Sequence, residues 1–180
     1  FIAQGSILAI ASILVRVMGM IYRIPMTAII GDKGNGFYSY AYSVYTILLL
    51  LSSYSLPLAV SKMVSAKAQL GQWRNVKRVF ICAIAFAIGI GTTFGLIVLI
   101  GAQFFTRVFF HSELAAIALR FMAPTILIMA LLGVFRGFFQ GLQNTLPTAV
   151  SQIVEGLINA IMSVVFAYFL FDFGHGMDAA

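Results

Sequence analysis

The sequence contains few charged residues for its length. Only 9% of its 180 residues are charged, and 62% are hydrophobic. An ordinary soluble domain is about a quarter charged and about half apolar. A soluble fold with so little charge would have too few charged residues for a surface in contact with water, so lipid must surround much of this chain. The composition therefore excludes a soluble domain and predicts an integral membrane protein.

Cysteine and histidine are also scarce. Cys82 is the only cysteine, so the chain can form no internal disulfide, and the two histidines lie far apart. No cluster of these residues has the spacing of metal ligands, and no nucleophile–base pair is visible. The sequence therefore predicts no metal or other cofactor and no enzymatic activity.

Acidic residues are the rarer of the two charged classes, with five Asp and Glu against eleven Lys and Arg. In a soluble protein such an excess would suggest nucleic acid as a partner. Here many of the basic residues gather in one short segment between apolar runs, which is typical of membrane topology. We therefore expect membrane lipids, and no nucleic acid, around this chain.

Five apolar runs are long enough to cross a bilayer, whose hydrocarbon core of about 30 Å requires about 20 helical residues. Strands of a membrane barrel would instead alternate over about ten residues, and these runs do not alternate. The sequence thus predicts an all-α membrane protein, a bundle of about five transmembrane helices. The runs cover approximately residues 2–22, 37–60, 79–101, 114–135 and 147–171.

The segment 61–78 indicates the orientation, because it is basic and contains no acid. By the positive-inside bias, this segment and the connection that begins with Arg136 are cytoplasmic. The amino terminus is then inside the cell. An amphipathic helix on the inner leaflet and a plain topogenic loop are both compatible with the segment. Its basic residues are Lys62, Lys67, Arg74, Lys77 and Arg78.

Two arginines interrupt the first apolar run. A charged side chain near the bilayer centre costs about 2.5–3.5 kcal/mol, so it usually faces a protein interior or a wet cavity. Arg16 and Arg23 are seven residues apart, which places them on one helical face about 10 Å apart. Since guanidinium groups match phosphate oxygens, we predict that both bind an anionic substrate. A structural ion pair for Arg16 and snorkelling of Arg23 to the headgroups are the alternatives.

The fifth run carries polar residues at a spacing that forms a single helical stripe. We predict that the stripe lines a cavity and that Gln152 and Asn159 bind substrate. Hydrogen bonding between helices is the alternative interpretation. Glu155 is the only acid deep in a span, which makes it the expected partner of Arg16 and a candidate site for proton or cation coupling. The stripe comprises Thr148, Gln152, Glu155, Asn159 and Ser163.

Five segments carry a family resemblance: Gly31–Tyr38, Leu56–Lys62, Gly71–Arg74, Arg136–Gln143 and Leu146–Gln152. They resemble the stage V sporulation protein B/YtgP branch of the multidrug/oligosaccharidyl-lipid/polysaccharide exporter superfamily, to which the lipid II flippase MurJ belongs. The resemblance extends over essentially the whole chain.

The resemblance implies a MATE-like fold, in which two six-helix lobes surround a cavity that opens alternately to either side of the membrane. The chain begins with Phe1, and we expect residues 1–180 to be a partial amino-terminal lobe that lacks the sixth helix and the carboxy-terminal lobe. The implied substrate is an undecaprenyl-pyrophosphate-linked saccharide, first of all lipid II, in the bacterial cytoplasmic membrane. Arg16 and Arg23 match the inward arginines of such flippases, whereas Glu155 receives no role from the resemblance.

Two other functions are compatible with parts of the sequence. A cation-coupled multidrug exporter of the same superfamily would favour acids in this lobe, whereas the chain places two inward arginines and one acid there. A non-transporting membrane scaffold for wall synthesis would require none of these charges, so their substitution would be silent.

Overall fold

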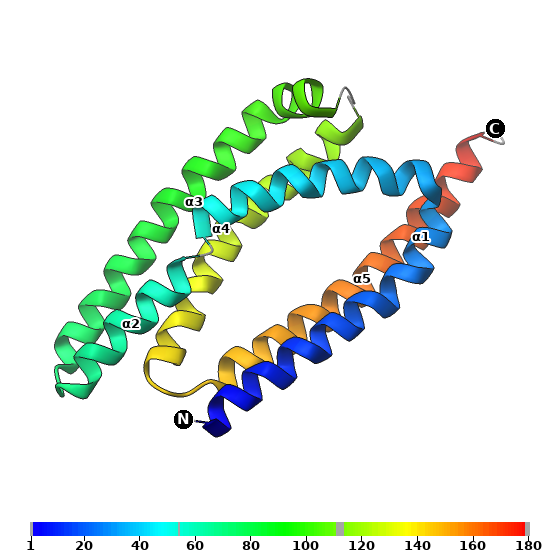
Figure 1. Cartoon of the computed structure of the whole chain (residues 1–180). Helices are drawn as coiled ribbons and strands as arrows, with labels where there is room; N and C mark the ends of the chain where they lie inside the picture. The colour runs from blue at the N-terminus through cyan, green and yellow to red at the C-terminus, as the bar shows by residue number, and fades with distance from the viewer. Residues whose placement is uncertain (1, 54, 111–113, 179–180) are drawn as a thin grey trace. The chain divides into compact units, whose positions relative to one another are not determined.

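The computed structural model describes residues 2–53, 55–110 and 114–178. In these ranges the chain forms five α-helices, shown in Figure 1: α1 Ile2–Ser53, α2 Leu56–Gln69, α3 Trp73–Phe110, α4 Leu114–Gly141 and α5 Leu146–Asp178. Four stretches of the described residues are long and apolar enough to cross a membrane: Gly5–Pro25, Trp73–Val108, Ala116–Gly141 and Leu146–Phe166. The prediction of an all-α, multi-pass membrane protein is confirmed.

The second predicted run, residues 37–60, is divided between the end of α1 and the beginning of α2. Residue 54, between these helices, is outside the described residues. Within α1 the backbone departs from helical geometry at Gly31, with φ 73° and ψ 173°. Glycine adopts positive φ at little cost because it has no Cβ. The interval between the first two predicted runs, residues 23–36, therefore contains a kink at Gly31, and helical residues continue on both sides of it.

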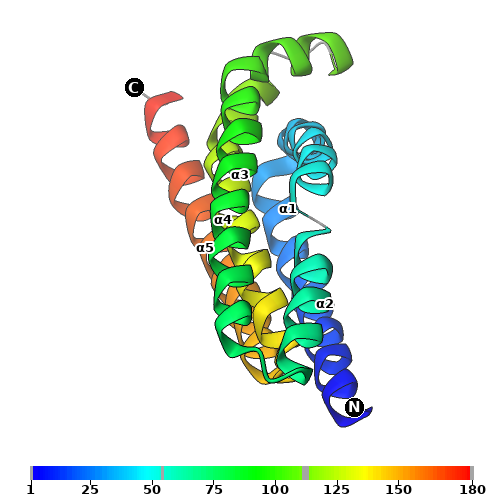
Figure 2. The same ribbon diagram turned by 90° about the vertical axis from the view of Figure 1, so that its left-hand side faces the viewer.

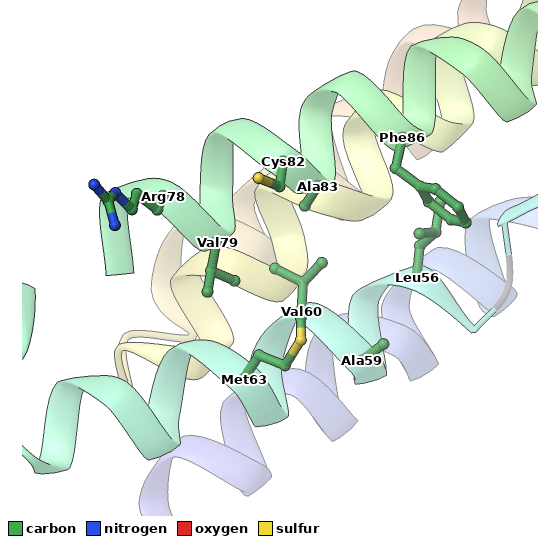
Figure 3. A pocket seen from close by; sticks show the side chains of 9 residues that line it. All are labelled: Leu56, Ala59, Val60, Met63, Arg78, Val79, Cys82, Ala83 and Phe86. Carbon is green, nitrogen blue, oxygen red and sulfur yellow. The ribbon is translucent and has the colours of Figure 1, made fainter. Parts of the chain in front are cut away.

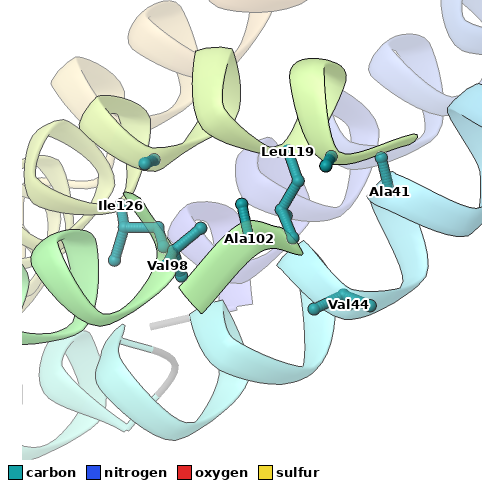
Figure 4. Close-up of a cluster of buried hydrophobic side chains, with 8 residues drawn as sticks. Ala41, Val44, Val98, Ala102, Leu119 and Ile126 are labelled. Atoms are coloured by element: carbon teal, nitrogen blue, oxygen red, sulfur yellow. The ribbon is translucent and has the colours of Figure 1, made fainter. Parts of the chain in front are cut away.

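The chain forms two compact units, one from residues 1–36 and 145–180 and the other from residues 37–144. In the second unit α3 and α4 lie side by side (Figures 1 and 2). Apolar side chains from the end of α1 join them in one buried cluster, shown in Figure 4: Ala41, Val44, Val98, Ala102, Ala116, Leu119, Ala123 and Ile126. A second buried cluster joins α2, α3 and α4: Leu56, Val60, Val64, Val76, Ala87, Ala130 and Val134.

Glycines of α4 allow α2 to approach very closely in this second unit. A Cβ added to Gly137 would lie 2.5 Å from the carbonyl oxygen of Pro57, and one added to Gly141 would lie 2.7 Å from Cβ of Val64. Small residues four apart permit such backbone contact between membrane helices. Two of the segments that carry the family resemblance, Leu56–Lys62 and Arg136–Gln143, thus meet here, and the glycines of Arg136–Gln143 serve packing.

The predicted connection 61–78 contains the end of α2, a short turn and the beginning of α3. The turn passes through Gly71, whose φ is 68°. The apolar face of α2 is buried against α3 and α4, whereas its basic neighbours Lys62, Arg74, Lys77 and Arg78 are exposed. The amphipathic pattern therefore separates a buried protein face from a charged outer face.

Candidate functional site

All five predicted site residues lie in the first unit, on the early part of α1 and on α5. These two segments run side by side in the same direction (Figure 1). A Cβ added to Gly156 would lie 3.3 Å from Cγ1 of Val15 and 3.2 Å from Cε of Met18. Gly156 therefore lets the two helices touch at this level, as small residues do between membrane helices.

This contact sets the relative level of the two charges in the spans. Arg16 follows Val15 directly, and Glu155 precedes Gly156 directly. Because Val15 and Gly156 meet, the opposite charges lie at the same level along the helix pair. Both are exposed, and each lies near the middle of its span, Gly5–Pro25 or Leu146–Phe166.

Tyr22 and Asn159 connect the two helices farther along, about two turns after Val15 on α1 and about one turn after Gly156 on α5. The side-chain amide of Asn159 donates a hydrogen bond to the hydroxyl oxygen of Tyr22 at 3.4 Å. The hydroxyl of Ser163 in turn donates to Oδ1 of Asn159 at 3.2 Å. Asn159 thereby makes one of the interhelical hydrogen bonds that the alternative interpretation of the stripe expects. Arg23 follows Tyr22 in the chain and is exposed at this level.

Gln152 is one turn before the Gly156 contact on the same stripe. Its Oε1 atom is buried and accepts no hydrogen bond from the residues that the structure describes. A buried acceptor left unsatisfied costs about 1–3 kcal/mol. A hydrogen-bond donor placed at this atom would recover that cost.

Of the stripe of α5, Asn159 contacts α1 through its hydrogen bond to Tyr22. Thr148 is buried, Gln152 and Ser163 are half-buried, and Glu155 and Asn159 are exposed. A cavity along this stripe, and the ion pair of Glu155 with Arg16, stay predictions.

Two residues of the site were not predicted from the sequence. Gly156 meets Val15 and Met18, and Tyr22 accepts the hydrogen bond of Asn159, yet neither Gly156 nor Tyr22 stands out by charge or by motif. A signal was present on α1, because Val15, Met18 and Tyr22 follow the i, i+3, i+7 spacing of one helical face. Arg16 and Arg23 are each one residue farther along, which rotates them by about 100° from this face.

The chain is similar to several known proteins over most or all of its length. Residues 1–174 match the family described as polysaccharide biosynthesis protein. The lipid II flippase MurJ of Bacillus subtilis (strain 168) is 27% identical over 163 residues, which is 86% of this chain and 30% of the relative. Stage V sporulation protein B of the same strain is 26% identical over 180 residues, all of this chain and 35% of the relative.

A third relative in that strain, the uncharacterized membrane protein YabM, is 25% identical over 181 residues, or 33% of its own length. The chain thus spans about a third of the length of the curated relatives it matches. No solved structure gives a significant match.

Proposed function

The chain belongs to the polysaccharide biosynthesis protein family, and on this premise we propose that the intact protein is a flippase for an undecaprenyl-pyrophosphate-linked saccharide. The substrate that we propose is lipid II, the peptidoglycan precursor. The similarity of this chain to the lipid II flippase MurJ supports this choice of substrate. A substrate of this class places a charged headgroup in a polar chamber and leaves its apolar tail in the bilayer.

The observation that carries the proposal is an exposed guanidinium in the middle of a membrane span. Arg16 is exposed near the centre of Gly5–Pro25, at the level of Glu155. Facing lipid there would cost about 2.5–3.5 kcal/mol, so such residues mark substrate or ion pathways. The geometry thus supports a water-accessible chamber beside α1 and α5.

In this proposal Arg16 and Arg23 bind the pyrophosphate, because their planar forks suit phosphate oxygens. Gln152 and Asn159 bind polar groups of the saccharide. Glu155 couples transport to a proton or cation by competing for Arg16. The whole protein works by alternating access, and a sixth helix and a second lobe complete the chamber.

We further propose that the protein lies in the bacterial cytoplasmic membrane with its amino terminus inside. The segment 61–78 supports this orientation, because it contains basic residues and no acid. A cysteine-accessibility assay at Leu70, which is exposed in the turn between α2 and α3, tests it. Labelling of Leu70→Cys by an impermeant reagent in intact cells would show that the orientation is the opposite of the one we propose.

Depletion of the intact protein tests the flippase function directly. We expect the lipid-linked precursor to accumulate in the inner leaflet of cells that have no redundant flippase. The measurement is the fraction of precursor open to an externally added headgroup-modifying enzyme. Precursor that still reaches the outer leaflet at the normal rate would reject the proposal.

The same depleted cells distinguish the two other functions. A multidrug exporter would leave the precursor distribution unchanged and lower resistance to cationic drugs. If the protein were a scaffold, the wild-type protein, Arg16→Ala and Glu155→Gln would all restore the depleted cells equally. A flippase requires that Arg16→Ala fail while Arg74→Ala, which removes an exposed arginine outside the stripe, restores transport.

A further inference from the structure

An apolar groove lies between α2 and α3. It has a volume of about 460 Å³, within the range of about 300–1,000 Å³ that is usual for ligand sites. Arg78 is its only charged lining residue. The other lining residues, shown in Figure 3, are Leu56, Ala59, Val60, Met63, Val79, Cys82, Ala83 and Phe86.

The two ends of the groove differ in chemistry. Arg78 lies at the end nearest the turn between α2 and α3, and Leu56 and Phe86 lie at the opposite end (Figure 3). Between the ends Ala59 and Ala83 are small, and this leaves room for a narrow apolar occupant. The groove therefore fits a molecule with an anionic end and one long hydrocarbon chain.

The surroundings of Arg78 strengthen this charge pattern. Arg74 and Lys77 are exposed and precede it closely in the sequence, Lys67 is half-buried near the end of α2, and residues 61–78 contain no acid. Clusters of four to eight basic residues beside a membrane helix are typical of sites for anionic lipids. Trp73, which is 63% exposed at the start of α3, is the residue type that lies at the headgroup level.

We propose that this groove binds an anionic phospholipid, with one acyl chain between α2 and α3 and the phosphate on Arg78. The occupant is a resident lipid of the membrane, and the site does not depend on which substrate the protein transports. The lipid completes the packing of α2 in the bilayer at its basic end.

Quenching by brominated lipids tests the site in the intact protein reconstituted in phosphatidylcholine vesicles. Phe86→Trp places a fluorophore in the groove. Trp73 and every other native tryptophan of the intact protein are changed to phenylalanine, so that only the new side chain fluoresces. Phosphatidylglycerol and phosphatidylcholine with brominated acyl chains are compared at equal mole fraction. We expect phosphatidylglycerol to occupy the groove about fivefold more strongly through Arg78.

Two pairs of variants separate the site from general surface charge. Arg78→Gln should abolish the preference for phosphatidylglycerol, whereas Lys62→Gln removes the same charge outside the groove and should keep it. Ala59→Phe should fill the groove and reduce quenching by both lipids, whereas Ala66→Phe, on the exposed surface of α2, should not.

Three results would overturn the proposal. Equal quenching by both lipids in the Phe86→Trp protein would show an unselective annular surface. Equal effects of Arg78→Gln and Lys62→Gln would assign the preference to net charge alone. The absence of quenching by either lipid would show that another part of the intact protein covers the groove.

Discussion

The two units of the chain use different kinds of contact between helices. In residues 37–144 the helices meet through alanine, valine and glycine, as at the contact of Gly137 with Pro57. In the other unit one glycine contact is flanked by Arg16, Glu155 and a hydrogen bond of Asn159. Lipid gives no hydrophobic drive to helix association, so the first kind provides stability through shape. The second kind retains costly polar groups, which indicates function.

Gly137→Ala should show the largest effect on stability. The new Cβ would lie 2.5 Å from the carbonyl oxygen and 2.9 Å from Cα of Pro57, so backbone has to move. We expect the free energy of unfolding to fall by about 3 kcal/mol, the upper end of the usual overpacking range. Thermal unfolding of the detergent-solubilised intact protein measures this loss.

The matched control is Gly89→Ala on α3, where an added Cβ meets no atom within 4 Å. Its effect should stay within about 0.5 kcal/mol, as for other surface substitutions. Equal unfolding temperatures for the two variants would mean that α2 and α4 are not held by close contact.

Arg16→Ala should show the reverse pattern, with function lost and stability kept. Removing a hydrogen bond between charged groups costs about 2 kcal/mol, which corresponds to roughly 30-fold weaker binding of the lipid-linked precursor. Precursor titration by native mass spectrometry measures this, with Arg74→Ala as control. If Arg16→Ala lowers the unfolding temperature and leaves binding unchanged, Arg16 serves as a structural ion-pair residue.

The sequence predicted the helical class because a spanning chain must satisfy its backbone internally, so long apolar runs become helices. It did not predict the ends of α3, since this helix continues through Lys77 and Arg78, where hydropathy alone suggests a loop. The stripe of α5 followed from its spacing. Tyr22 and Gly156 were not predicted, because the face of α1 that meets α5 is set by packing between segments far apart in the chain.

Gln152→Leu should sharpen the contrast by raising stability at the expense of binding. The substitution removes a buried oxygen that has no donor among the described residues, which should stabilise the protein by about 1 kcal/mol. Binding of the precursor should weaken in the same variant. Gln103→Leu, at an exposed position of α3, is the control, and lower stability of Gln152→Leu would remove Gln152 from the candidate site.

Tyr22→Phe should have the smallest effect, because it deletes one long hydrogen bond of 3.4 Å from Asn159. Such bonds between membrane helices contribute about 0.6 kcal/mol on average and about 1.7 kcal/mol at most. A double-mutant cycle with Asn159→Ala measures the coupling energy, and Tyr168→Phe, which is exposed on α5, is the control for losing a hydroxyl.

We expect this coupling at or below about 0.6 kcal/mol, since the bond is long and Asn159 is exposed. A weak bond can be exchanged for one to a substrate hydroxyl at little cost, as a binding residue requires. A coupling near about 1.7 kcal/mol would instead make Asn159 a residue that holds α1 and α5 together. Polar contacts would then stabilise the first unit, as apolar contacts stabilise the second. Asn159 would no longer be proposed as a substrate-binding residue.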